Sequence, residues 1–157
     1  MAAEGRAAMA DASLQVMATI VRLRTAQCEA ARADLLSAEQ DLVRVTEAEE
    51  RVKTTRDHAE AGWRDMLRER RPDPGLVRLA GSWLVERERD VATAHLDSEI
   101  AGRQRDASRE ALQQARARLD ASAEVRSLRV RAVARHREQI EMADAADQFL
   151  QGRRSWR

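Results

Sequence analysis

Arg68-Glu69-Arg70-Arg71-Pro72-Asp73-Pro74-Gly75-Leu76 is the stretch that decides the fold, and it contains both prolines of the 157-residue chain. Proline lacks a backbone donor and clashes with the preceding helical turn, so a first helix is expected to stop near Arg71. Asp73 is a good N-cap, and Pro74 suits the first position of a second helix. We therefore predict a turn over 71–75 between helices of about 10–70 and 76–150. A proline-bent linker between independent helices is the alternative.

The composition favours long helices over a compact globular core. Charged residues make up 35% of the chain, aromatic residues make up 3%, and alanine supplies much of the 43% hydrophobic content. Such a mixture is typical of coiled coils. Cys28 is the only cysteine, which excludes an internal disulfide. The N-terminus lacks the apolar core of a signal peptide, and no apolar run is long enough to span a membrane, so we expect a soluble cytoplasmic protein.

A seven-residue repeat runs along the first predicted helix, with the spacing of the a and d positions of a left-handed coiled coil. One seam position is occupied by Leu14, Val21, Cys28, Leu35, Leu42, Glu49, Arg56 and Trp63. The other is occupied by Met17, Arg24, Ala31, Ala38, Val45, Val52, Ala59 and Met66. The charged seam residues are expected to fix the register of pairing, the alternative being that they open toward a partner.

The second predicted helix begins with the same repeat and then becomes less regular. Its seam residues before the irregular part are Val77, Ala80, Leu84, Val91 and Ala94. The pattern weakens over 97–105. It resumes with Leu112, Ala115 and Leu119 and continues with Val133, Ile140, Ala143 and Leu150. Val125, Leu128 and Val130 do not fit this phase. We therefore expect one or two phase slips, at which the supercoil locally unwinds.

In an antiparallel hairpin the residue numbers rise along one helix while those of the facing residues on the other helix fall. Facing residues should therefore have numbers with a constant sum. The pairs that add up to 143 are Met66 with Val77, Trp63 with Ala80, Ala59 with Leu84, and Val52 with Val91. This sum places the turn between residues 71 and 72 without reference to the prolines. The predicted fold is all-α: two long helices form an antiparallel coiled-coil hairpin, a single elongated domain over 1–157 with a short basic tail over 151–157.

The sequence predicts no catalytic site, no metal site and no cofactor. The three histidines, His58, His95 and His136, fall at distant levels of the expected hairpin and cannot share one metal ion. His95 and Glu99 have helical i,i+4 spacing, which usually marks a solvated face. Cys28 occupies a seam position, where a small buried apolar role is expected in place of nucleophilic catalysis.

Two glycines and two tryptophans lie at one level near the turn. The numbers of Gly62 and Gly81 add up to 143, and Trp63 and Trp83 stand beside them. Glycine within a helix costs about 1 kcal/mol relative to alanine, so the pair indicates close backbone approach or room for a ring. Either each ring fills space over the opposing glycine, or the group forms a recognition surface, since exposed tryptophan is a common interface anchor.

Positive charge gathers in the last third of the second predicted helix. The arginines there are Arg116, Arg118, Arg126, Arg129, Arg131, Arg135 and Arg137. The middle of the first helix is instead acidic. A basic end favours an acidic protein, a nucleic acid or an anionic membrane, and a solvated arginine face is the alternative. Nucleic acid is less favoured, because no fingerprint motif or stacking aromatic residue accompanies the arginines.

Three features resemble the FliJ/YscO family, the stalk proteins of flagellar and injectisome type III secretion ATPases. They are the unbroken helix before a central turn, Trp83 in Gly81-Ser82-Trp83-Leu84, and the ending Ala145-Ala146-Asp147-Gln148-Phe149-Leu150-Gln151-Gly152-Arg153-Arg154. Gln148 departs from the family, in which an acidic residue is frequent there. The resemblance implies a cytoplasmic stalk, peripheral to a membrane-embedded secretion apparatus. Its terminal end would insert into a hexameric ATPase, and its turn-side half would reach the export gate and couple ATP hydrolysis to export.

The resemblance also implies which surfaces would meet these partners. The candidate contacts to the ATPase ring are Arg126, Arg129, Arg131, Arg135, Arg137, Phe149, Arg153 and Arg154. The candidate contacts to the export gate protein are Trp63, Trp83, Leu84, Val91 and His95. Some members of the family also bind secretion chaperones.

Other functions remain open at this stage. One alternative is a generic coiled-coil scaffold or adaptor without an ATPase partner. Another is an arm inserted into a transcription or translation machine, but the tip lacks the acidic residues expected for a channel that holds a metal. Binding of an anionic membrane or a nucleic acid through the arginines is a further possibility, although no nucleic acid partner is expected.

Overall fold

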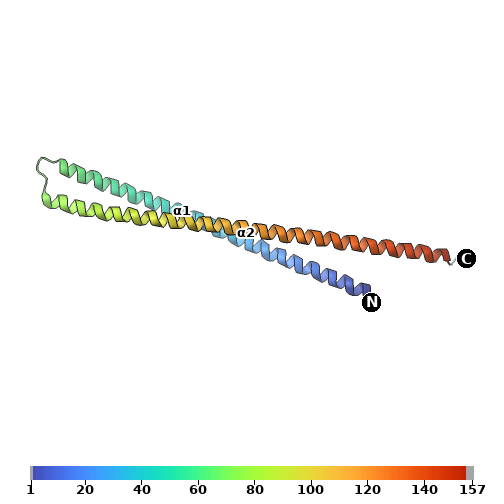
Figure 1. Ribbon diagram of the computed structural model, residues 1–157. Coiled ribbons are helices and arrows are strands. Elements are labelled where there is room, and N and C mark those ends of the chain that lie inside the picture. Colours follow the sequence, from blue (N-terminus) through green and yellow to red (C-terminus); the bar gives the residue numbers. More distant parts are fainter. Residues whose placement is uncertain (1, 155–157) are drawn as a thin grey trace. The chain divides into compact units, whose positions relative to one another are not determined.

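The computed structural model describes the backbone of residues 2–154 and the side chains of residues 9, 11–146, 148 and 149. The chain forms two helices, α1 (Ala2–Arg68) and α2 (Pro74–Arg154), and the described residues contain no strand. Figure 1 shows α1 in blue to green and α2 in yellow-green to red, with a short connection between them. The two helices contact each other extensively, which confirms an all-helical protein built from two long helices.

The connection between the helices follows the local chemistry of its residues. Helix α1 ends at Arg68, three residues before the expected stop near Arg71. Helix α2 begins at Pro74, where the missing N–H has no intrahelical partner in any case. The Asp73 carboxylate accepts hydrogen bonds from the backbone N–H groups of Gly75 (2.7 Å) and Leu76 (3.4 Å), and the Asp73 carbonyl accepts the Val77 N–H at 3.0 Å. The predicted N-cap is therefore confirmed.

The predicted seam of α1 is its shielded stripe. Every seam residue from Leu14 to Met66 is half-buried or buried, and Glu49 and Ala59 are buried. The residues between them are mostly exposed, so the helix has one narrow face turned away from solvent. The seven-residue repeat of the sequence thus identifies the packed face of α1.

The shielded stripe of α2 differs from the expected one, because it shows no phase slip between residues 77 and 122. Gly81, Asp90 and Gly102 are half-buried beside the stripe. The stripe itself consists of Val77, Ala80, Leu84, Arg87, Val91, Ala94, Ser98, Ala101, Arg105, Ser108, Leu112, Ala115, Leu119 and Ser122. Their spacing alternates between three and four without interruption. The expected slip over 97–105 was wrong, because small serines and the aliphatic stems of arginines occupy seam positions that a search for apolar residues passes over.

The stripe becomes irregular only after Ser122. Val133 is half-buried, as its predicted seam position requires, but Ile140 and Ala143 are exposed. The predicted seam residue Leu150 and the tail residues 155–157 lie outside the part whose side chains or backbone the structure describes. Residues 151–154 of the expected tail belong to α2.

The chain divides into two compact units, each containing segments of both helices. Unit 2 comprises Ala31–Leu112, and unit 1 comprises Met1–Ala30 with Gln113–Arg157. The buried apolar residues among the described ones are Ala59, Ala101 and Leu112, and none of the described side chains is fully buried. Two helices shield their seam from one side only, so each unit buries little apolar surface and draws modest stability from it.

Candidate interaction surfaces

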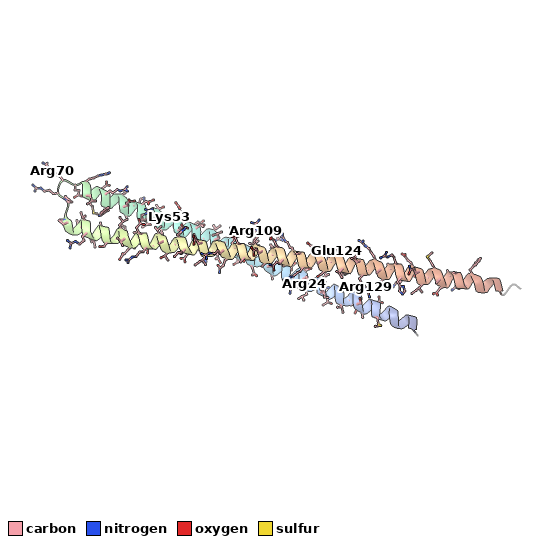
Figure 2. All side chains as sticks on the ribbon, in the orientation of Figure 1. Arg24, Lys53, Arg70, Arg109, Glu124 and Arg129 are labelled. Atoms are coloured by element: carbon pink, nitrogen blue, oxygen red, sulfur yellow. The ribbon has the colours of Figure 1, made fainter. Side chains whose placement is uncertain are left out.

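Five of the candidate ring contacts lie exposed on α2 within unit 1. They are Arg126, Arg129, Arg131, Arg135 and Arg137. Two of these also contact α1 of the same unit. The Arg129 Nε donates to Ser13 Oγ at 3.3 Å, and Arg137 Nη2 lies 2.8 Å from Asp11 Oδ1. Figure 2 labels Arg129 on this part of α2. The basic surface is therefore largely open to a partner, although two of its guanidinium groups also help to hold α2 against α1.

The C-terminal part of the same candidate set is only partly described. Phe149 is 69% exposed near the end of α2. Arg153 and Arg154 belong to α2, and their side chains lie outside the described residues. The sequence between Arg137 and Phe149 carries four acidic residues and no basic one, so the exposed ring of Phe149 is an apolar feature separate from the basic surface.

The two tryptophans near the turn have different environments. Trp63 is half-buried in the seam, and a Cβ added to Gly81 would lie 3.6 Å from its indole nitrogen. A Cβ added to Gly62 would meet no atom within 4 Å. Trp63 therefore fills the space over Gly81, as one of the two interpretations expected, but no ring fills the space over Gly62. The glycine therefore gives room for a ring at Gly81 only.

Trp83 belongs to the surface and not to the seam. Its side chain is 45% exposed, and the Arg87 guanidinium lies 5.5 Å from the centre of its ring. This distance permits a cation–π interaction, worth about 0.5–1 kcal/mol at an exposed site. The stacked guanidinium holds the indole on the surface, where a partner can reach it.

The remaining candidate gate contacts are divided between seam and surface. Leu84 and Val91 are half-buried residues of the α2 seam. His95 is exposed, and it contacts both helices: Nδ1 lies 3.1 Å from Glu49 Oε1 on α1, and Nε2 lies 3.7 Å from Glu99 Oε1 on α2. Trp83 and His95 are therefore the members of this set that present the most surface to solvent. The expected solvated His95–Glu99 pair is in fact linked to α1.

A polar layer surrounds the buried carboxylate of Glu49 within unit 2. Glu49 is only 7% exposed, and Lys53 Nζ lies 2.9 Å from its Oε1. The hydrogen bond from Lys53, above all, lowers the pKa of Glu49 from 4.5 to about 2, and His95 acts in the same direction, although burial acts in the opposite direction. The same bond to Glu49 raises the pKa of Lys53. Figure 2 labels Lys53. The layer satisfies a buried charge in the seam, which otherwise would strongly destabilise the packing of α1 and α2.

A second charged seam residue of α1 also reaches across to α2. Arg56 Nη1 lies 3.4 Å from Glu88 Oε1, and its Nε lies 3.1 Å from Asp57 Oδ1 on its own helix. Sequence reasoning recognised Glu49 and Arg56 as interruptions of the seam and missed their partners. The signal was present, because Glu49 with His95 and Arg56 with Glu88 each give a residue-number sum of 144, one more than the sum of the apolar pairs.

In the part of the chain that the structure describes, no group of three or more His, Cys, Asp or Glu is placed to hold a metal ion. No helix among these residues combines the length and the apolar character that a membrane crossing requires. Comparisons with protein-family models, with curated proteins and with solved structures find no match to this chain.

Proposed function

We propose that α1 and α2 form an antiparallel coiled-coil hairpin that serves as the central stalk of a type III secretion ATPase. In this role the arginine-rich part of α2 enters the hexameric ring, and the part near the turn faces the export gate protein. The stalk thereby couples ATP hydrolysis to export. The observation that carries the proposal is the exposed row of arginines in unit 1, and the exposed ring of Phe149 near the end of α2 adds an apolar contact.

The hairpin part of the proposal is supported by the order of contacts within unit 2. Trp63 lies beside Gly81, Arg56 beside Glu88, and Glu49 beside His95, so the partner number rises as the α1 number falls. Polar residues at seam positions select one register, because only that register gives each buried charge its partner. This is the register-fixing role that the sequence favoured for the charged seam residues.

A disulfide test examines the pairing directly. We replace Cys28 by serine and introduce cysteines at Val52 and Val91, two half-buried seam residues with a predicted residue-number sum of 143. Oxidation should close an intramolecular bond between them. Cysteines at Val52 and Val77 provide the control, because both positions face the seam at different levels. A bond that forms equally well in the control would contradict the proposed register.

The stalk function is tested by ATPase stimulation. The chain is mixed with the secretion ATPase of its own organism, and the rate of ATP hydrolysis and the amount of hexamer are measured. Both should rise with the unmodified chain. Reversal of Arg135 to glutamate together with Phe149→Ala should reduce the stimulation at least about fivefold, since anchor residues of an interface typically cost 1–2 kcal/mol or more each. Trp83→Ala, far from these residues in sequence, provides the control and should leave the stimulation unchanged.

A generic coiled-coil scaffold or adaptor is the second candidate function. It is favoured by the polar layers at Glu49 and Arg56, which fix a register in any two-helix spacer and need no ATPase. The two candidates differ in one outcome. A chain that neither binds the ATPase nor changes its rate of ATP hydrolysis would exclude the stalk function and leave the scaffold function. Secretion chaperones and the export gate protein can be tested as partners in the same binding assay.

A further inference from the structure

An exposed strip on α1 combines apolar and acidic side chains. Leu36 and Val43 are 52% and 57% exposed, with Gln40 between them. Glu39 and Glu47 border the same shallow depression. Arg44 also borders it, but its guanidinium is paired with Asp41 at 2.9 Å. We call the strip of Leu36, Glu39, Gln40, Val43 and Glu47 the acidic strip.

An exposed strip on α2 has the same pattern with the opposite charge. It lies in unit 1 and is lined by Ala123, Arg126, Ser127, Val130 and Arg131. All of its residues except the half-buried Ser127 are exposed, and Val130 retains 46% of its surface. We call this set the basic strip. It carries two cations and no acidic residue.

The apolar and central polar residues of the two strips have the same spacing. Leu36, Gln40 and Val43 have an apolar, polar, apolar order with steps of four and three residues. Ala123, Ser127 and Val130 repeat that order with the same steps. Seven-residue spacing is what keeps two supercoiled helices in contact over successive turns. Glu39 and Arg126 both stand three residues after the first apolar residue, so this position carries opposite charges in the two strips. Arg131 corresponds to Arg44, whose guanidinium is already paired with Asp41.

We propose that the acidic strip of one copy packs against the basic strip of a second copy of this chain. The wider charge distribution supports a second copy as the occupant, because unit 1 has 13 arginines and nine acidic residues by sequence, whereas unit 2 has 15 basic and 18 acidic residues. Complementary charge brings opposite units of two copies together and repels like units. The paired strips then cover apolar side chains that the two helices of one copy leave in water.

The inference goes beyond the proposed stalk function, since it concerns the chain without any ATPase. Sedimentation equilibrium of the full chain measures its self-association at low and high salt. Association should be present at low salt and weaken as salt is added, because exposed ion pairs are screened. Reversal of the basic strip (R126E with R131E) or of the acidic strip (E39R with E47R) should each raise the dissociation constant by at least about tenfold, since like charges then face each other.

Charge exchange makes the test independent of effects on folding. An equimolar mixture of the two reversed variants should associate again, and so should a chain that carries all four substitutions. Two controls change the net charge equally at exposed positions outside the strips: R109E with R116E, and E86R with E110R. The dissociation constants of these controls should stay close to that of the unmodified chain, apart from the effect of the changed net charge, which the strip variants share.

Several results would overturn the proposal. A chain that sediments as a monomer at every concentration and salt would leave the strips to another partner. Reversed variants that associate as strongly as the unmodified chain would show that self-association uses another surface. Failure of the mixture and of the fourfold variant to associate would show that the strips do not pair with each other. None of these outcomes depends on ATPase binding, so the stalk function can fail or hold separately.

Discussion

Replacing Leu112 by alanine should test how far the narrow seam stabilises the protein. Leu112 is 6% exposed and is one of the three buried apolar residues among those described. The substitution removes about three carbon atoms from the seam, and at about 0.8 kcal/mol for each buried CH₂ it should cost roughly 2–3 kcal/mol. A chain of this size loses about 2–4 °C of melting temperature per kcal/mol, so the melting temperature should fall by roughly 5–10 °C.

The measurement is thermal unfolding followed by far-ultraviolet circular dichroism. It is made at high salt and low protein concentration, so that self-association does not add to the apparent stability. Leu96→Ala provides a matched control, because Leu96 is on the same helix and is 56% exposed. Alanine has a higher helix propensity than leucine, so any loss of stability in a Leu→Ala variant reflects lost packing and not a weaker helix. The control should change the free energy of unfolding by less than about 0.5 kcal/mol.

The comparison of the two leucines can refute the reasoning. Equal losses at Leu112 and Leu96 would mean that the exposed face is packed in solution and that the seam is not the main source of stability. A negligible loss at Leu112 would mean that unit 2 and unit 1 draw their stability from the polar layers and not from apolar burial. The expected result is a large loss at Leu112 only.

Three further predictions concern the polar layer, the cap and the glycines. Because the folded-state pKa of Glu49 is about 2 against an ordinary value of 4.5, the stability that its ionised form contributes is present above about pH 4.5 and lost as the pH falls toward 2. Glu49→Gln should therefore flatten the dependence of the melting temperature on pH in this range. A variant with the same pH dependence as the unmodified chain would contradict the stabilising role of the polar layer. Asp73→Ala should cost about 1 kcal/mol through loss of the N-cap, while Asp73→Ser should restore most of it in the same urea titration. Gly62→Ala and Gly81→Ala should each stabilise the chain by up to about 1 kcal/mol, because the first meets open space and the second an ordinary contact with Trp63 at 3.6 Å; destabilisation at Gly81 would show that close approach of the helices requires a glycine there.

Local features of this chain could be predicted because they depend on neighbouring residues. The prolines and Asp73 fix where α2 begins, since capping and the loss of a backbone donor act within a few residues. The seam of α1 could be predicted because its repeat persists from Leu14 to Met66 and a helix turns all of these residues to one side. Trp83 precedes the seam residue Leu84 by one position, so its exposure follows from the same helical geometry.

The candidate surfaces could be predicted less well from the sequence. The arginines of α2 were recognised as a basic group, but the sequence did not distinguish Arg129 and Arg137, which contact α1, from Arg126, Arg131 and Arg135. It did not show that Leu36, Val43 and Val130 stay exposed. Both distinctions depend on which direction each side chain faces after the two helices have packed.

The sequence by itself therefore determined two long helices, the residue that caps the second, and the shielded stripe of the first, since these follow from short-range geometry. Only the tertiary structure decided the partners across the seam. It paired Glu49 with His95 and Arg56 with Glu88, and it kept α2 in phase through Ser98 and Arg105. The physical reason is that a buried charge selects a register by the hydrogen bonds available on the opposite helix. Those bonds exist only when residues distant in sequence have been brought within about 3 Å of each other.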